Sequence, residues 1–149
     1  MLKVLVARLA VSSALAASPL AYAAAPVIDV YKTASCGCCT AWVDHLASNG
    51  FKVHAHNVEQ PGAIRAKFGI GEQYGSCHTG VVNGYAIEGH VPAQSIKKLL
   101  KEKPKANGLA VPGMPMGSPG MEGHRKDAYD VLLIGKNGKA STFTSHKGD

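Results

Sequence analysis

The chain lacks several features that would place it in common classes of protein. Beyond its first two dozen residues it has no apolar run long enough to cross a bilayer about 30 Å thick, so we predict no membrane span. Aromatic residues make up only 6% of the 149 residues, and none is interleaved among the lysines of segment 97–105. A basic run of this kind is typical of a solvated helix face, and we therefore expect no binding to nucleic acid.

The one strongly apolar stretch lies at the N-terminus and has the pattern of a secretory signal peptide. Lys3 and Arg8 form a short basic region, an Ala/Leu/Val-rich stretch follows, and residues 21–23 supply the small-x-small pattern of a cleavage site. We predict that residues 1–23 are a cleaved signal peptide and that residues 24–149 form one exported, periplasmic domain. An uncleaved amphipathic anchor is the alternative, although the stretch lacks a polar face. The net charge of +6 includes both basic residues of this leader, so the exported part is only mildly basic.

Cysteine is scarce, and its distribution is unusual. The chain has four cysteines, and three of them are Cys36, Cys38 and Cys39. A domain of this length can bury a core without cross-links, and a bridge between adjacent cysteines constrains almost nothing. In an oxidising compartment, unguarded thiols also tend to become disulfides. We therefore predict that these cysteines, together with Cys77, serve chemistry at one spot.

The order of predicted elements indicates a mixed α/β domain. Residues 27–31 are short and β-branched, and residues 51–56 alternate with period two, so each stretch predicts a strand. Between them, apolar residues recur at helical spacing from Cys38 or Cys39 up to the stop at Asn49. The cysteine cluster is thus predicted to lie in a turn between a strand and a helix.

The chain is predicted to continue with a helix at 61–68, a glycine-rich loop at 69–75 that leads to Cys77, and a hairpin at 81–87 with Asn-Gly at its turn. A helix over 92–103 follows. The order β-α-β-α-β-β-α is that of thioredoxin-like domains, and we predict a thioredoxin-like α/β fold. Right-handed crossover places the first strand-to-helix turn at the carboxyl end of the sheet, where open α/β sheets hold their sites.

Residues 104–128 depart from this plan. They contain five glycines, four prolines and three methionines and show neither helical nor strand periodicity. We predict an irregular Met/Gly/Pro-rich loop there. Residues 129–145 then predict a C-terminal β-hairpin that adds to the edge of the sheet.

The cysteines form a C-x-x-C frame, Cys36 and Cys39, with a third thiol inside it. A helix N-terminus favours the thiolate, which both attacks disulfides and binds metal. In thioredoxin-like folds the loop that carries Cys77 faces this turn, so we expect all four sulfur atoms to converge. Thiolate and thioether ligands select Cu(I). We therefore predict that Cys36, Cys38, Cys39 and Cys77 hold copper as Cu(I), and that clustered thiols favour sulfur bridges between more than one ion.

Other interpretations of the same cysteines stay open. A thiol-disulfide oxidoreductase or arsenate-reductase-like enzyme would use Cys36 as nucleophile and Cys39 as resolving thiol, although Cys38 would invite scrambling. A structural zinc module is a third interpretation, but four-cysteine zinc sites normally show two separated C-x-x-C pairs. Cys38 and Cys77 also have an alternative as buried apolar thiols. Enzymatic activity is left undecided, with copper redox chemistry as the form it would take.

Further donor atoms are available outside the cysteines. The candidates, as ligands or as hydrogen-bond partners of ligands, are His78, His90, His124, Met114, Met116 and Met121. The methionines have an ordinary alternative as hydrophobic anchors that pin the loop to the core. We expect Glu88 to be a surface carboxylate, with the orientation of a histidine as the alternative. The histidines expected at the surface are His45, His54, His56 and His146.

Taken together, these motifs closely resemble those of a known family, the CopG-type periplasmic copper-resistance proteins. The matching segments are Cys36-Gly37-Cys38-Cys39 with Trp42, Ser76-Cys77-His78-Thr79, the stretch 85–93 and the stretch 108–122. The resemblance spans nearly all of residues 24–149. It implies a thioredoxin-like domain that binds several copper ions through its cysteines, here Cys36, Cys38, Cys39 and Cys77. It also implies an association with periplasmic copper efflux or oxidase components and a role in interconverting Cu(I) and Cu(II).

Overall fold

The computed structural model describes residues 25–149, so the predicted signal peptide lies outside the described residues. Among these residues are seven strands, three α-helices and one short 3-10 helix. In chain order they are β1 (Val27–Lys32), α1 (Gly37–Ser48), β2 (Lys52–Asn57), α2 (Pro61–Lys67), η1 (Glu72–Tyr74), β3 (His78–Val82), β4 (Tyr85–Gly89), α3 (Ala93–Glu102), β5 (Ala106–Val111), β6 (Tyr129–Gly135) and β7 (Ala140–His146). The mixed α/β class is confirmed, while the thioredoxin-like assignment stays a prediction.

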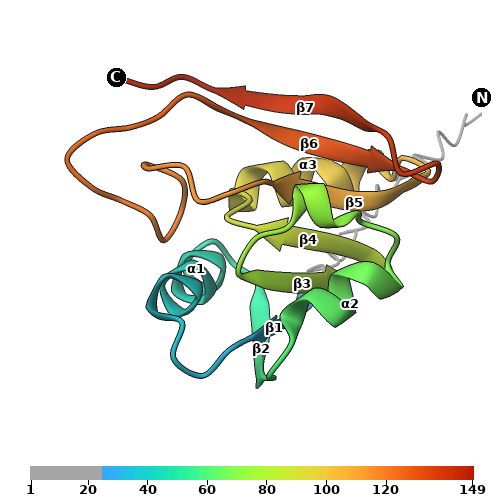
Figure 1. Ribbon diagram of the computed structural model, residues 1–149, viewed down its shortest axis with the longest axis horizontal. Coiled ribbons are helices and arrows are strands. Elements are labelled where there is room, and N and C mark those ends of the chain that lie inside the picture. Colours follow the sequence, from blue (N-terminus) through green and yellow to red (C-terminus); the bar gives the residue numbers. More distant parts are fainter. Residues whose placement is uncertain (1–24) are drawn as a thin grey trace, which may run out of the picture.

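All seven strands belong to one sheet, in the order β2-β1-β3-β4-β5-β6-β7 (Figure 1). The pairs β1–β2 and β4–β5 are parallel, as expected for strands joined through helices α1 and α3, and the other pairs are antiparallel. The predicted C-terminal hairpin is confirmed, because β6 and β7 pair and extend the sheet to its edge. No helix among residues 25–149 has the length and apolar character needed to cross a membrane.

One face of the sheet carries the larger hydrophobic core. Helices α1 and α3 supply apolar side chains to this face, and alternate residues of the strands pack against them. Its largest fully buried members are Ile28, Trp42, Leu46, Ile87, Ile96, Leu99 and Leu109. Burial of each aliphatic side chain contributes about 1.5–3 kcal/mol. The Trp42 indole also donates a hydrogen bond to the Val91 carbonyl oxygen at 2.9 Å, which ties α1 to the segment leading into α3.

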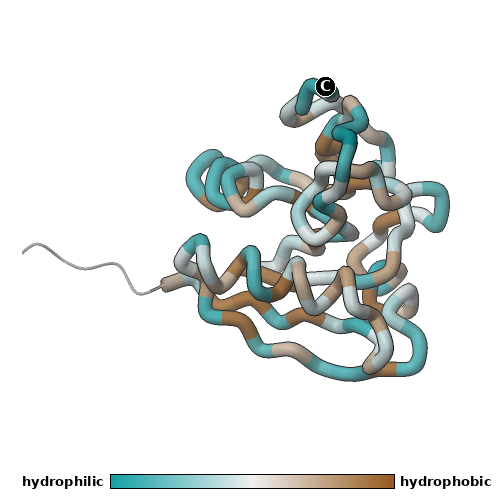
Figure 2. The backbone as a smooth tube through the Cα atoms, turned by 90° about the vertical axis from the view of Figure 1, so that its left-hand side faces the viewer, coloured by the Kyte–Doolittle hydropathy of each residue, from teal (hydrophilic) through white to brown (hydrophobic). Residues whose placement is uncertain are grey.

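The opposite face carries a smaller core, formed with the segment that follows α2. Ile70 packs there with Ala86, Ala110 and Ile134 of three neighbouring strands. Figure 2 shows the most hydrophobic residues along the strands in the interior, with hydrophilic residues mainly in the outer turns. The central strands are therefore covered on both sides.

The structure corrects the prediction of an irregular segment over residues 104–128. Residues Ala106–Val111 form strand β5, which lies between β4 and β6. Both of its faces are buried, since Leu109 belongs to the larger core and Ala110 to the smaller one. A strand covered on both sides shows no alternation of apolar and polar residues, and Asn and Gly inside it are poor strand formers. Residues 112–128 contain no helix or strand, as predicted.

A second correction concerns His45, which is partly buried instead of facing solvent. Its Nε2 accepts a hydrogen bond at 3.1 Å from the backbone N–H of Ala93, the first residue of α3. The residue before α3 is Pro92, whose side chain offers no capping hydrogen bond, so His45 satisfies an N–H that the helix leaves open. Burial lowers the pKa of His45, which keeps Nε2 available as an acceptor.

The other histidines expected at the surface differ in their surroundings. His54 and His56 lie exposed on β2, as predicted. His146 is not in an irregular tail, because it ends β7 with its ring stacked on Tyr129 at a centroid distance of 4.7 Å. The pairing of β6 with β7 brings these two rings opposite each other.

Gly108 explains how β5 fits against β4. A Cβ atom at this position would collide with the backbone of Ala86 on the neighbouring strand. We expect Gly108→Ala to lower the free energy of unfolding by about 1–3 kcal/mol, because the two backbones would have to separate. Denaturant unfolding measures this change.

Gly37→Ala is the matched control, since a Cβ there meets nothing within 4 Å. Its free energy of unfolding should stay close to that of the unmodified chain. If Gly108→Ala were as stable as this control, the close approach of β5 to β4 would be contradicted.

Candidate metal centre

The cysteine cluster is built on the turn between β1 and α1. Cys36 is the N-cap residue of α1, and its Sγ accepts a hydrogen bond from the backbone N–H of Cys39 at 3.3 Å. Sulfur here takes the place of the oxygen that usually caps a helix. The positive end of a helix dipole favours negative charge on a sulfur at this position when the cysteine is a free thiol.

Cys36 and Cys39 are joined by a disulfide, with their Cα atoms 5.3 Å apart. Cys39 is fully buried, and its Sγ lies 3.8 Å from the carbonyl oxygen of Cys77. Cys38 and Cys77 are free, half-buried thiols. The structure therefore represents the oxidised form of the C-x-x-C pair.

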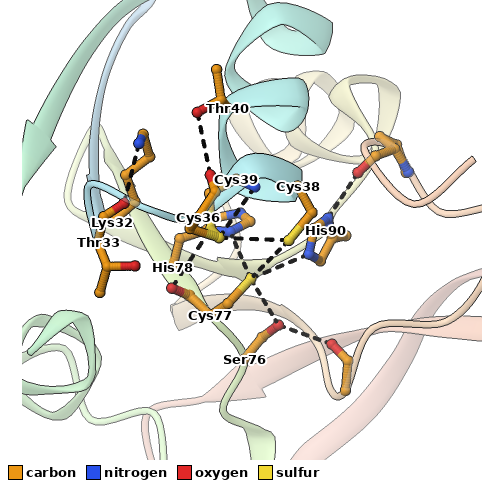
Figure 3. Close-up of a disulfide and its surroundings, with 12 residues drawn as sticks. Lys32, Thr33, Cys36, Cys38, Cys39, Thr40, Ser76, Cys77, His78 and His90 are labelled. Carbon is orange, nitrogen blue, oxygen red and sulfur yellow. Dashed lines mark hydrogen bonds between the residues drawn. A yellow bond between two sulfur atoms is a disulfide. The ribbon is translucent and has the colours of Figure 1, made fainter.

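The predicted meeting of the four sulfur atoms is observed. The Sγ of Cys38 lies 3.5 Å from the Sγ of Cys36 and 4.0 Å from that of Cys77, which belongs to the loop before β3. All four sulfur atoms lie within 4.8 Å of one another. Figure 3 shows the thiols of Cys38 and Cys77 directed at each other beside the disulfide.

Two imidazole rings complete the cluster around Cys77. The Nδ1 of His78 and the Nε2 of His90 each lie 3.3 Å from its Sγ, and these three residues form a second group whose donor atoms lie within 4.8 Å of one another. The Nδ1 of His90 lies 2.9 Å from the carbonyl oxygen of Pro119, which can only accept, so Nδ1 carries the proton. The lone pair of its Nε2 then faces the sulfur.

Burial keeps these groups uncharged. It lowers the pKa of His78 to about 3, with a smaller contribution from His90, whose own pKa burial also lowers. The His78 ring packs against Trp42 at a centroid distance of 4.4 Å, and its buried Nε2 has no hydrogen-bond partner among the described residues. Burial, together with the Cys38 thiol, raises the pKa of Cys77 to about 11. Without metal, a neutral thiol thus faces two neutral imidazoles, and a bound cation would replace its proton.

A buried carboxylate that the sequence analysis placed at the surface holds the Cys77 segment. Glu88 is fully buried, and one of its oxygens accepts hydrogen bonds from the Ser76 N–H at 2.6 Å and from Arg65 at 3.3 Å. Its other oxygen accepts from the Thr79 hydroxyl at 2.6 Å. Ser76 and Thr79 flank the Cys77-His78 pair, so Glu88 positions both residues without touching a histidine. The signal available in the sequence was an acidic residue inside an otherwise apolar strand.

The loop 112–128 covers the same end of the sheet (Figure 1). A Cβ at Gly120 would lie 2.6 Å from the carbonyl oxygen of Cys38, and Gly120 has a φ of +85°, so glycine lets this loop pass against the first turn of α1. The contact between Pro119 and His90 fixes the loop from the other side. The loop thus closes over the cysteines.

The remaining candidate donors differ in their exposure and in their contacts with the cysteine cluster. Met114 is 51% exposed, Met116 and Met121 are half-buried, and His124 is exposed. Within residues 25–149, none of these four makes a hydrogen bond to the cysteine cluster, whereas His78 and His90 both contact Cys77. The imidazoles beside Cys77 are therefore the stronger candidates.

Four sulfur atoms and two imidazoles at one end of an α/β sheet define a candidate metal-binding protein. Residues 74–121 match the family described as "Protein of unknown function, DUF411". A solved structure titled "Copper resistance protein copG- Form 2" is 48% identical, with a TM-score of 0.78, over 82% of this chain and 98% of that chain. The structure titled "Form 1" is 49% identical, with a TM-score of 0.77 and the same coverage. No curated protein matches the chain. The chain belongs to the family of the CopG copper resistance proteins.

The hydrogen bonds of Glu88 with Ser76, Arg65 and Thr79, here called the Glu88 network, provide a test of how Cys77 is positioned. Glu88→Gln leaves one buried donor without its acceptor and Arg65 without its counter-charge, so we expect the free energy of unfolding to fall by about 1–3 kcal/mol. Denaturant unfolding measures the loss. Glu102→Gln, at an exposed position on α3, is the control and should change stability by less than about 0.5 kcal/mol. Equal stability of the two variants would show that the network does not hold the segment.

Proposed function

We propose that this chain is a periplasmic copper-resistance protein that holds Cu(I) on Cys36, Cys38, Cys39 and Cys77. The observation that carries the proposal is the position of four sulfur atoms, from two segments far apart in the chain, within 4.8 Å of one another. Further support comes from the solved structures titled copper resistance proteins, which share nearly half of their aligned residues with this chain.

The chemistry of the donor atoms favours Cu(I). Thiolates are soft ligands, and imidazole nitrogen also suits copper. Cys77 belongs both to the group of four cysteines and to the group with His78 and His90, so its sulfur faces two sets of donors at once. A thiolate in this position can bridge two ions. We therefore propose that the centre takes more than one copper ion, with Cys77 as the shared ligand.

The Cys36–Cys39 disulfide connects copper binding to redox state. In the oxidised form the two sulfur atoms are bonded to each other, and only Cys38 and Cys77 remain as thiols. Reduction with two electrons and two protons restores both thiols. In the reverse direction, the two thiolates can each give one electron to a Cu(II) ion, which yields two Cu(I) ions and the disulfide. We propose this exchange as the route by which the chain interconverts Cu(II) and Cu(I).

The cellular setting follows from the leader and the charge pattern. Residues 1–23 direct export, so the centre meets copper in the periplasm. Partners are copper ions themselves and the efflux or oxidase components that remove or oxidise copper there. Nucleic acid is not a partner.

A titration of the reduced chain with Cu(I) tests the proposal. Under anaerobic conditions, native mass spectrometry should detect more than one Cu(I) per chain, because four thiolates and two imidazoles exceed what one ion uses. Cys36→Ser should lose these ions together, since a shared cluster fails as a unit. His124→Ala is the control and should keep the full number. One ion or none on the reduced chain would contradict the multi-copper centre.

A thiol-disulfide oxidoreductase is the second candidate, favoured by the Cys36–Cys39 disulfide at the start of a helix. If this were the function, insulin reduction would continue after strict removal of copper, and Cys36→Ser would abolish it. We expect turnover below about one-tenth of that of a dedicated oxidoreductase, because Cys38 lies 3.5 Å from Cys36 and competes in disulfide exchange. Turnover at the full enzymatic rate without copper would favour the second candidate.

A further inference from the structure

A second group of metal-ligating side chains lies on the edge of the sheet. Asp29 of β1 has its Oδ1 2.8 Å from the Nε2 of His56 and 3.7 Å from the Nδ1 of His54, both on β2. One carboxylate oxygen thus lies between two imidazole nitrogens. We call these three residues the edge cluster.

The strand register produces this arrangement. In the parallel pair β1–β2, Asp29 lies beside His54, and Tyr31 lies beside His56. Residues two apart on a strand point to the same face, so all four side chains project together. The Tyr31 ring stacks on His56 at a centroid distance of 4.9 Å, which restricts the orientation of that imidazole.

The edge cluster lies apart from the cysteine centre. Val30 and Lys32, which alternate with Asp29 and Tyr31, are buried on the face covered by α1, where Trp42 packs on His78. The edge cluster is therefore on the opposite face. The exposed fractions of its side chains are 41% for Asp29, 49% for His54 and 44% for His56, so an ion reaches them from solvent.

The edge cluster contributes little to the free energy of unfolding, so stability does not explain why these side chains lie together. Ion pairs between exposed side chains contribute only about 0–1 kcal/mol, and a neutral imidazole contributes less. Within residues 25–149, neither imidazole makes a hydrogen bond to any side chain other than Asp29. Only the His56 ring makes a hydrogen bond to this carboxylate, and the His54 nitrogen lies beyond hydrogen-bond distance from it.

We propose that Asp29, His54 and His56 form a second metal site, for a divalent transition-metal ion, with Cu(II) bound most tightly. Two imidazoles and a carboxylate are donors of intermediate hardness, which suit Cu(II), Ni(II) and Zn(II), and the general order of affinities places Cu(II) first. Binding of the ion replaces the hydrogen bond between His56 and Asp29, and the exposed rings turn toward the ion. This inference does not rest on the proposed function of the cysteine centre.

Titration with Cu(II) tests the site in the full-length exported chain, with its disulfide intact and Cys38 and Cys77 alkylated. Alkylation stops the thiols from reducing Cu(II). We expect one Cu(II) per chain, with an electron paramagnetic resonance signal that shows coupling to two nitrogen nuclei. His54→Ala and His56→Ala should each weaken binding by at least about tenfold, because the chelating pair is broken. Circular dichroism should stay unchanged, since both positions are exposed.

His124→Ala removes an exposed histidine elsewhere and should leave binding unchanged. If His124→Ala and His54→Ala weakened Cu(II) binding equally, Cu(II) would be bound at scattered surface histidines. That result would overturn the proposed site. The proposal would also fail if the double variant His54→Ala/His56→Ala kept the Cu(II) signal. A repeat with Ni(II), measured by calorimetry on the chain without alkylation, should show the same dependence on His54 and His56. The proposal would also be overturned if neither His54→Ala nor His56→Ala weakened Ni(II) binding.

Discussion

The position of Cys77 depends on a single buried carboxylate. Glu88 lies inside β4, where an unpaired charge would cost several kcal/mol, and it is tolerated because three donors converge on it. Two of these donors, Ser76 and Thr79, flank the Cys77-His78 pair. The hydrogen bonds that make the buried charge acceptable therefore also hold the segment of Cys77 and His78 against the first turn of α1. Fold stability and site geometry are coupled through one side chain.

The candidate centre is assembled from four separate parts of the chain. The turn before α1 supplies three cysteines, the loop before β3 supplies Cys77 and His78, the end of β4 leads to His90, and loop 112–128 covers them. Each part is placed by a different feature: helix capping, the Glu88 network, pairing within the sheet, and glycines that allow close backbone contact. The proposed multi-copper centre, shared among such elements, would need little reorganisation of the backbone when it is loaded.

The sequence predicted the elements whose patterns are local. The strands β1 and β2, the Asn-Gly hairpin, the proline-started helices and the C-terminal hairpin all carry signals within a few residues. Strand β5 was missed because its neighbours on both sides bury it, and that burial is a property of the sheet. The same limit applies to Glu88 and His45. Both were expected near solvent, and both have partners, Ser76 and Ala93, that only the fold brings near.

At the candidate centre, spacing alone indicated that three cysteines act together, and the predicted fold, with its loop facing the cysteine turn, added Cys77. The sequence did not separate His78 and His90 from His124, because it favoured none of the three as a ligand over the others. Only the fold brings two of them within 3.3 Å of Cys77. The edge cluster was hidden for a similar reason, since Asp29 is far from His54 and His56 in sequence and meets them through strand register.

Trp42 is the only tryptophan of the chain, and its ring lies against His78 inside the centre. Indole fluorescence is sensitive to the charge and to the heavy atoms in its immediate surroundings. The chain therefore carries an intrinsic optical probe in contact with the residue next to Cys77, and all indole emission of the protein arises from that one place. Events at the cysteines can be followed in real time without any label.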